Sequence, residues 1–190
     1  MAPVRIYLAG PEVFLPDAAA VGAAKAELCT KHGFEGLFPL DAALDLSGLT
    51  KPWKARRISH ANESLMRSCA GLIANLTPFR GVSVDAGTAF EVGFMRALSR
   101  PVFGYSNVRA DYVERSQAFR RERRSQPDAD APDVAIEDFD GAENLMIESA
   151  IIASGGSIVR NTVARGQEMR DLTGFEACLL QARAHVRLRP

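Results

Sequence analysis

Short, almost continuous apolar runs alternate along this chain with longer segments whose apolar residues recur every three or four positions. The run Gly-Leu-Ile-Ala-Asn-Leu at 71–76 is typical of a strand that helices cover on both faces. By the same criteria we expect strands at 4–9, 36–40, 101–105 and 157–159, and helices at 17–32, 53–69, 82–99, 143–153 and 172–186. Because strands and helices alternate, the pattern predicts a parallel, doubly wound α/β sheet with right-handed crossovers.

Residues 109–140 interrupt this alternation. They contain a dense charge run at 120–124, followed at 126–133 by a segment rich in Asp, Ala and Pro. This composition favours a mobile surface excursion, and a lid over a binding site is the alternative. Since 190 residues suit one hydrophobic core, we expect a single domain over 1–190 that carries this excursion.

The charge balance limits the classes of partner. The chain has 47% hydrophobic and 24% charged residues, as packed globular proteins do. Its 23 basic and 23 acidic residues give a formal net charge of +0, so no overall field attracts nucleic acid or an anionic membrane. No segment has the length and apolar character of a membrane span or a signal peptide. We therefore expect a cytoplasmic protein that binds neither nucleic acid nor membrane.

Sequence signatures of common cofactors are missing. The three cysteines and three histidines are scattered without metal-ligand spacing, and neither a disulfide framework nor a metal site is expected. No GxGxxG and no GxxxxGK[ST] pattern occurs, which disfavours dinucleotide and P-loop triphosphate binding. We expect no metal and no cofactor.

Ligands of open α/β sheets bind beyond the carboxyl ends of the strands, and this directs attention to the loop at 77–88. This loop leads to Asp85 and Glu91, two carboxylates six residues apart with Gly87 between them. Glu91 has apolar neighbours on both sides, and small residues lie on its helical face. A small ligand therefore has room to approach this carboxylate.

Three stretches of the chain resemble the nucleoside 2-deoxyribosyltransferase family. They are Ile-Tyr-Leu-Ala-Gly-Pro at 6–11, the long segment from Leu76 to Gly93 with Asp-Ala-Gly-Thr-Ala-Phe-Glu-Val-Gly at its end, and Asn-Leu-Met at 144–146. The resemblance implies a flavodoxin-like fold with a five-stranded parallel sheet in three α/β/α layers. It also implies transfer of a 2-deoxyribosyl group between nucleobases, with deoxyribonucleosides and free nucleobases as substrates, by a homo-oligomer with shared active sites.

The matched positions have expected roles. By resemblance, Glu91 is the nucleophile that attacks the anomeric carbon, Tyr7 orients it, and Asp85 lies in the substrate pocket as a third catalytic candidate. The expected substrate-binding residues are Gly10, Asp41, Asn62, Phe79, Gly87, Asn144 and Met146. The last two match residues that reach the sugar in a neighbouring subunit's site. Without the resemblance, the pattern favours a core aromatic at Tyr7 and a helix cap with a core methionine at Asn144 and Met146.

The chemistry of N-glycosidic bonds agrees with these roles. Cleavage passes through an oxocarbenium-like state, which a nearby carboxylate stabilises and can trap as a covalent glycosyl intermediate. Two displacements then replace one difficult step and retain the configuration. The departing base needs a proton, which Asp85 can provide if burial or like-charge proximity raises its pKa.

Two alternatives stay open. Deoxynucleoside 5'-monophosphate N-hydrolases share the fold and the glutamate, and they hold a phosphate with a Ser- and Arg-bearing loop after the first strand. Here that loop contains Glu12, so charge repulsion disfavours a phosphate, although Arg80 offers a cation. A non-catalytic nucleoside-binding protein on the same scaffold would use Glu91 only to accept a sugar hydroxyl.

Overall fold

The computed structural model describes residues 2–39, 44–125 and 134–187. In these residues five parallel strands form one sheet in the order β2-β1-β3-β4-β5. The strands are β1 Val4–Ala9, β2 Phe34–Leu37, β3 Gly71–Asn75, β4 Val102–Ser106 and β5 Ile158–Arg160. This order is that of flavodoxin-like doubly wound sheets, so the predicted fold class is confirmed.

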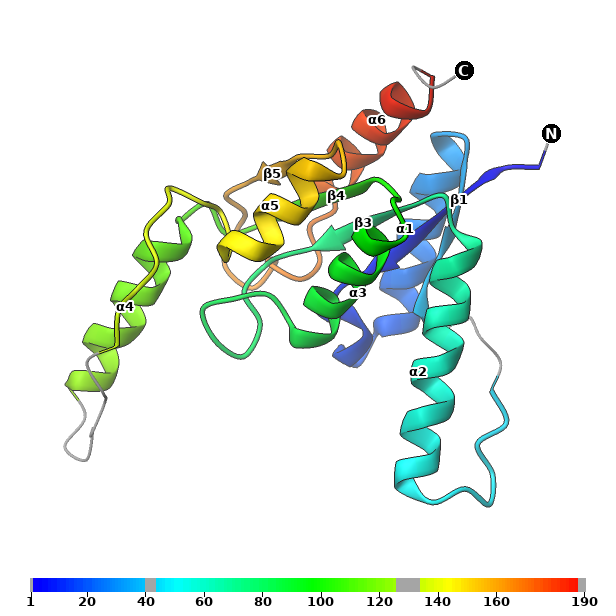
Figure 1. Ribbon diagram of the computed structural model, residues 1–190, viewed down its shortest axis with the longest axis horizontal. Helices are drawn as coiled ribbons and strands as arrows, with labels where there is room; N and C mark the ends of the chain where they lie inside the picture. Colours follow the sequence, from blue (N-terminus) through cyan, green and yellow to red (C-terminus); the bar gives the residue numbers. More distant parts are fainter. Residues whose placement is uncertain (1, 40–43, 126–133, 188–190) are drawn as a thin grey trace.

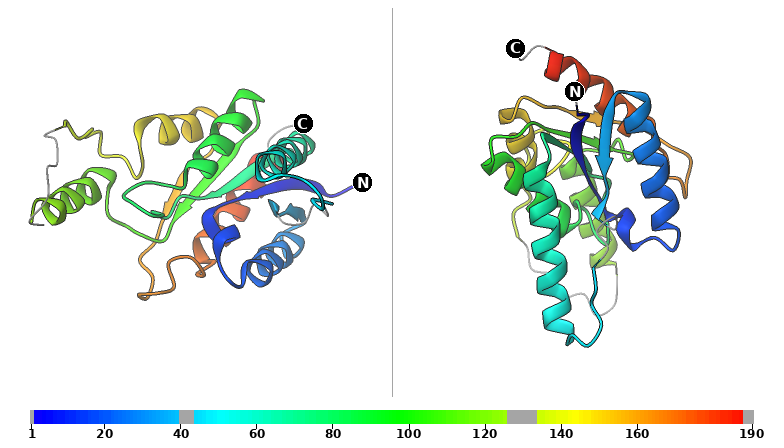
Figure 2. Two further views of the ribbon diagram at one scale, coloured as in Figure 1. Left: turned by 90° about the horizontal axis from the view of Figure 1, so that it is seen from below. Right: turned by 90° about the vertical axis from the view of Figure 1, so that its right-hand side faces the viewer.

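Helices cover both faces of the sheet and give three layers (Figures 1 and 2). One core packs α1 and α6 against the sheet, and a second core packs α2, α3 and α5 against the opposite face. The helices are α1 Ala18–Lys31, α2 Lys51–Ser68, α3 Ala86–Ala97, α4 Tyr112–Arg124, α5 Leu145–Ala153 and α6 Thr173–Arg187. A short 3-10 helix, η1 Pro11–Phe14, follows β1.

Alternation along β1 determines which side chains reach each layer. Ile6 and Leu8 belong to the core under α1 and α6, whereas Tyr7 and Ala9 belong to the core under α2, α3 and α5. This is the period of two expected of a strand that is buried on both faces. Tyr7 therefore extends from the centre of the sheet toward α3.

The segment at 109–140 differs from the expectation. Residues 112–124 form the helix α4 instead of an irregular excursion, because Asp111 and Glu114 make a capping box at its start. The helix projects from the body of the molecule and has no buried residue (Figure 1). The acidic stretch at 126–133 lies outside the described residues.

Two other predictions about local structure need correction. The helix expected from residue 82 begins only at Ala86, because Asp85 is its N-cap and the residues before it form a loop. The strand expected at 36–40 lies earlier in the chain, at Phe34–Leu37. The break expected at Gly10 and Pro11 is confirmed, because β1 ends at Ala9 and η1 follows. Within the described parts of the chain, no helix combines the length and apolar character needed to cross a membrane.

Candidate active site

The carboxylate of Glu91 on α3 and the phenol of Tyr7 on β1 meet in the core between the sheet and α3. The Tyr7 hydroxyl donates a hydrogen bond of 2.6 Å to Glu91 Oε1. Tyr7 is fully buried, and its strand has neighbours on both sides, so the donor has a fixed position. The bond holds the Glu91 carboxylate in one orientation and leaves Oε2 for another contact.

Glu91 lies on the wall of two adjoining cavities. The first has a volume of about 320 Å³ and is bounded by the loop after β1, by α2 and by the start of α3. The second has a volume of about 400 Å³ and lies between α2 and the start of α3. Four residues line both cavities: Ile58, Asn62, Gly87 and Glu91. Cavities of this size, apolar with a few polar groups, are typical of small-molecule sites.

The environment of Glu91 changes its protonation. Burial is the largest cause of a pKa raised to about 7, and the negative charges of Asp85 and Glu12 act in the same direction. The hydrogen bond from Tyr7 opposes this rise because it stabilises the carboxylate. Burial, with the charge of Glu91, also raises the pKa of Tyr7 well above its ordinary value. Tyr7 is therefore a neutral donor, and Glu91 titrates near neutral pH.

Asp85 forms the N-terminal cap of α3. Its Oδ2 accepts hydrogen bonds from the backbone N–H groups of Gly87 at 3.0 Å and Thr88 at 3.2 Å. A Cβ at position 87 would lie 2.9 Å from the same oxygen, so glycine suits this turn. Asp85 and Gly87 also line the smaller cavity. One oxygen of Asp85 thus fixes the start of the helix that carries Glu91, while Oδ1 takes no part in the cap.

The loop after β1 does not direct a negative charge into the cavity. Glu12 is fully buried and forms an ion pair with the fully buried Lys25 of α1. Asn75 donates to the same carboxylate at 2.9 Å, and so does the hydroxyl of Tyr105 at 3.0 Å. A Cβ on Gly10 would overlap Glu12 Oε2, so glycine is required at this wall of the cavity. The pairing with Lys25 weakens the repulsion of a phosphate that the sequence predicts for Glu12, although the charge of Glu12 still contributes to the raised pKa of Glu91.

Three side chains form a stack at the rim of the smaller cavity. Phe79 stacks on Phe14 with ring centroids 5.4 Å apart and an interplanar angle of 11°. The guanidinium of Arg80 lies 4.8 Å from the Phe14 centroid and 4.6 Å from the Phe79 centroid. Phe14 lines the cavity, whereas Phe79, an expected substrate-binding residue, is not among the lining residues and instead contacts Phe14. Sequence reasoning missed Phe14, although it lies only four residues beyond Gly10 at the end of β1.

A family model described as Nucleoside 2-deoxyribosyltransferase matches residues 6–146, which is most of the chain. The chain belongs to the nucleoside 2-deoxyribosyltransferase family. The match spans both segments that meet at Tyr7 and Glu91, so the predicted family is confirmed.

Three similar proteins each align with 80% or more of this chain. A 2-desoxiribosyltransferase from Leishmania mexicana has a TM-score of 0.67 at 26% identity, covering 96% of this chain and 99% of that one. An uncharacterized protein of Schizosaccharomyces pombe is 30% identical over 169 residues, which are 80% of this chain and 79% of that protein. A conserved protein from Enterococcus faecalis V583 shares the fold, with a TM-score of 0.59 at 20% identity, covering 95% and 99% of the two chains.

The remaining expected site residues of this nucleoside 2-deoxyribosyltransferase family member do not all meet at Glu91. Asn144 and Met146 line a separate cavity on the outer side of α3. Asn144 caps α5 by accepting a 3.0 Å hydrogen bond from the Met146 N–H, and the Met146 side chain is 71% exposed. Asp41 lies outside the described residues. Within one chain the structure therefore brings together Tyr7, Gly10, Asn62, Asp85, Gly87 and Glu91.

Proposed function

We propose that this family member transfers 2-deoxyribosyl groups between nucleobases, with Glu91 as the nucleophile. The observation that carries the proposal is the 2.6 Å hydrogen bond from Tyr7 to Glu91 at the wall of a cavity of small-molecule size. A carboxylate with one oxygen oriented by a neutral donor and the other facing a cavity suits attack on an anomeric carbon. Membership of a deoxyribosyltransferase family supports nucleosides and nucleobases as the substrates.

In the first displacement, a Glu91 oxygen bonds to the anomeric carbon while the N-glycosidic bond breaks. The electron pair of that bond goes to the base nitrogen, which takes up a proton as the base departs. Asp85 borders the same cavity and has an oxygen outside the cap, so it is the nearest candidate to contact the base. The product of this step is a glutamyl-deoxyribosyl ester.

In the second displacement, a nitrogen of another base attacks the same carbon and the ester bond breaks. Glu91 leaves as a carboxylate, to which Tyr7 again donates, and the incoming base loses its proton. Two inversions at one carbon give net retention. If water enters in place of a base, the same intermediate yields free deoxyribose, and the protein acts as a hydrolase.

One observation favours a second candidate, N-glycosidic cleavage of deoxynucleoside 5'-monophosphates. Arg80 is exposed at the cavity rim, and in the described residues no carboxylate pairs with it. Guanidinium groups are well suited to hold a phosphate. With Glu12 paired to Lys25, the exposed guanidinium of Arg80 offers a phosphate a cation that compensates part of the negative charge of Asp85 and Glu91 on the cavity wall.

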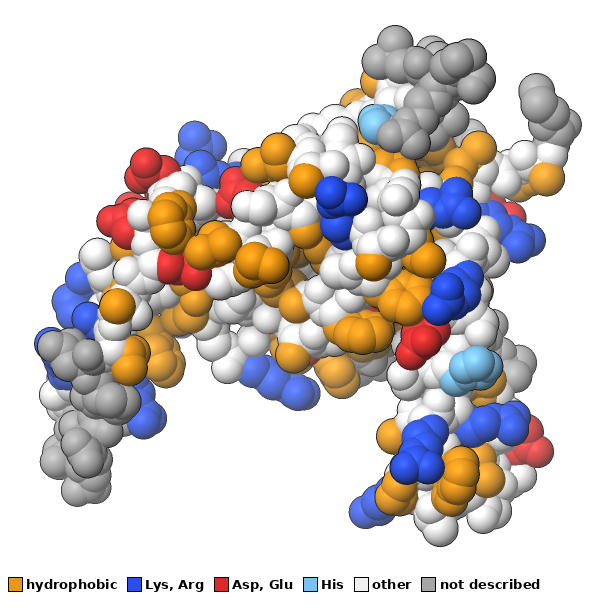
Figure 3. Space-filling view, in the orientation of Figure 1, with side chains coloured by type: hydrophobic (Ala, Val, Ile, Leu, Met, Phe, Trp, Pro, Cys, Tyr) orange, Lys and Arg blue, Asp and Glu red, His pale blue; other side chains and the backbone are white. Residues whose placement is uncertain are grey.

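We further propose a homo-oligomer in which Asn144 and Met146 serve the cavity of a neighbouring subunit. Hydrophobic side chains gather over α3 and α5 on one face of the molecule (Figure 3). Phe90 is 56% exposed, Ile152 60% and Met146 71%, which is unusual for large apolar side chains grouped on one surface. A second copy that covers this face would remove them from water.

The proposed transfer is tested by incubating the protein with deoxyinosine and adenine and separating the products by liquid chromatography. We expect deoxyadenosine and hypoxanthine together, and neither with Glu91→Ala. Free deoxyribose with hypoxanthine would identify a hydrolase, and turnover restricted to deoxyinosine 5'-monophosphate would identify the second candidate. If Glu91→Ala binds nucleosides unchanged and the unmutated protein turns over none of these substrates, the protein is a binding protein.

A further inference from the structure

A buried ion pair lies behind the loop that leads to Asp85, and the reaction above does not use it. Arg115 of α4 approaches Glu143, which lies just before α5, with 3.0 Å between the Arg115 guanidinium and Glu143 Oε2. The two side chains are only 8% and 1% exposed. Burial of two charges is costly unless further hydrogen bonds satisfy them, so their other partners are informative.

Glu143 accepts hydrogen bonds from the active-site loop. The Ser83 hydroxyl donates to Oε1, and the backbone N–H of Val84 donates to Oε2 at 3.2 Å. The N–H of Asn144 donates to Oε1 at 3.0 Å. Val84 is buried, so its N–H would lack a partner without this carboxylate.

Arg115 completes the attachment with three backbone carbonyl groups. Its Nε donates to the Val82 carbonyl oxygen at 2.8 Å. One terminal nitrogen donates to Ala110 at 2.6 Å and to Ala142 at 3.0 Å. Arg115 and Glu143 together therefore hold the three consecutive residues that precede Asp85.

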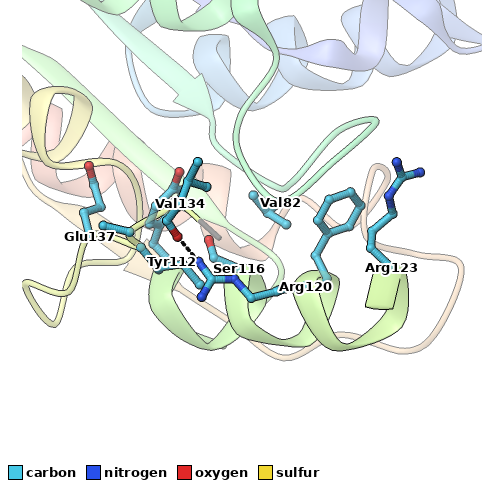
Figure 4. A pocket seen from close by; sticks show the side chains of 10 residues that line it. Val82, Tyr112, Ser116, Arg120, Arg123, Val134 and Glu137 are labelled. Atoms are coloured by element: carbon cyan, nitrogen blue, oxygen red, sulfur yellow. Dashed lines mark hydrogen bonds between the residues drawn. The ribbon is translucent and has the colours of Figure 1, made fainter. Parts of the chain in front are cut away.

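Side-chain packing does little to hold this loop from the α4 side. A cavity of about 500 Å³ lies between α4 and residues 134–137, and Val82 and Ser116 are among the residues that line it (Figure 4). No residue of α4 is buried as a whole, although the side chain of Arg115 is only 8% exposed. The hydrogen bonds of Arg115 and Glu143 therefore hold the backbone of this loop, while the Val84 side chain packs in the core under α2, α3 and α5.

We propose that Arg115 and Glu143 are positioning residues for the candidate reaction, which they support by fixing Val82–Val84 and, through Asp85, the start of α3. The inference rests on the proposed function of Glu91. Tyr7 belongs to a central strand and cannot follow a displaced α3, so movement of the loop separates Glu91 from its donor. Displacements of about 1 Å at a reacting group cost on the order of 100-fold in rate.

The test compares Glu143→Gln, Arg115→Met and Arg115→Lys with Glu35→Gln as the control. Glu35 pairs with Arg5 at the surface, at the opposite end of β1 from Glu91, so its loss leaves the site unchanged. Gln at 143 keeps the shape but presents an N–H group to donors. Lys at 115 keeps the charge but cannot donate to all four acceptors of Arg115, which are three backbone carbonyl oxygens and the Glu143 carboxylate.

We expect Glu143→Gln and Arg115→Met to lower kcat about 100-fold while KM changes less than about threefold. The kcat of Arg115→Lys should lie between the kcat of Arg115→Met and that of the unmutated protein. Thermal melts and circular dichroism identify variants that fail to fold, and the milder Ser83→Ala variant then tests the same bond to Glu143. Folded variants with kcat within about twofold of the control would overturn the proposal.

Hydrogen–deuterium exchange separates this inference from the proposed reaction. In Glu143→Gln we expect faster exchange of the Val84 and Asn144 amides and unchanged exchange in β1 and β3. If the unmutated protein has no glycosyl-transfer or hydrolytic activity, the proposed function fails whatever the exchange shows. Unchanged exchange at Val84 would overturn the positioning role even in an active enzyme.

Discussion

The Tyr7 hydroxyl donates to Glu91 Oε1 at 2.6 Å, although 84 positions separate the two residues in the sequence. A buried neutral donor at this position lowers the pKa of a carboxylate that burial raises to about 7. The contact therefore controls both the orientation and the charge of the proposed nucleophile.

The first prediction concerns pH. Because the proposed nucleophile is the carboxylate form, kcat/KM should increase about tenfold per pH unit below pH 7 and level off above it. The measurement is kcat/KM between pH 5 and 9, with a nucleoside that does not titrate in this range. A constant kcat/KM down to pH 5 would contradict the assignment of Glu91.

Removal of the donor tests the contact itself. Tyr7→Phe deletes the hydroxyl, so the pKa of Glu91 should rise and the acidic limb of the pH profile should move to higher pH. Loss of a hydrogen bond to a charged group costs about 1.5–3 kcal/mol, so kcat/KM at pH 7 should fall about 10- to 100-fold. An acidic limb that stays in place while activity falls would assign Tyr7 a different role.

The protonation of Glu91 also affects stability. Its folded pKa of about 7 exceeds the ordinary value of 4.5, so its contribution to stability is complete below pH 4.5 and is lost as pH rises through 7. Glu91→Gln removes the buried charge and should stabilise the protein by up to about 3 kcal/mol at pH 8, and much less at pH 5. Urea unfolding at the two pH values measures this. An equal change in the free energy of unfolding at pH 5 and pH 8 would mean that folding does not raise the pKa of Glu91.

Asp85 has a structural role and a proposed chemical one, and two substitutions separate them. Asp85→Asn keeps an oxygen acceptor for the Gly87 and Thr88 N–H groups, whereas Asp85→Ala removes the cap and should cost about 1 kcal/mol of stability. If Asp85 also acts on the leaving base, both variants lose kcat. Activity that is normal in Asp85→Asn and low in Asp85→Ala would limit Asp85 to capping.

Much of the fold could be predicted from the sequence because its signals are local. The apolar run at 71–76 and the glycine at position 33, which has φ 85°, mark a buried strand and a helix end directly. The helix α4 was not predicted from the sequence, because a dense charge run favours an irregular surface segment when composition alone is considered. Its capping box, Asp111 with Glu114, was the available local signal.

The candidate site was harder to predict where its charge and shape depend on contacts between side chains that are distant in the sequence. Glu91, Asp85 and Gly87 share one helix start, so the spacing in the sequence already grouped them. The sequence shows Glu12 as an unpaired charge in the loop after the first strand, because nothing at 10–14 indicates that Lys25 of α1 pairs with it. The stack of Phe14 on Phe79 likewise joins two loops that only the sheet order brings together.

The ion pair of Glu12 and Lys25 gives the last prediction. Both side chains are fully buried, so Lys25→Met leaves an uncompensated carboxylate in the core and should cost about 3–5 kcal/mol of stability. The double variant Glu12→Gln with Lys25→Met should recover most of this loss, because Asn75 and Tyr105 can still donate to the amide oxygen. The surface variant Arg5→Met is the control and should cost less than about 1 kcal/mol. Urea unfolding of the unmutated protein, Glu12→Gln, Lys25→Met and the double variant measures the coupling. Additive losses in the double variant would show that the two charges do not depend on each other.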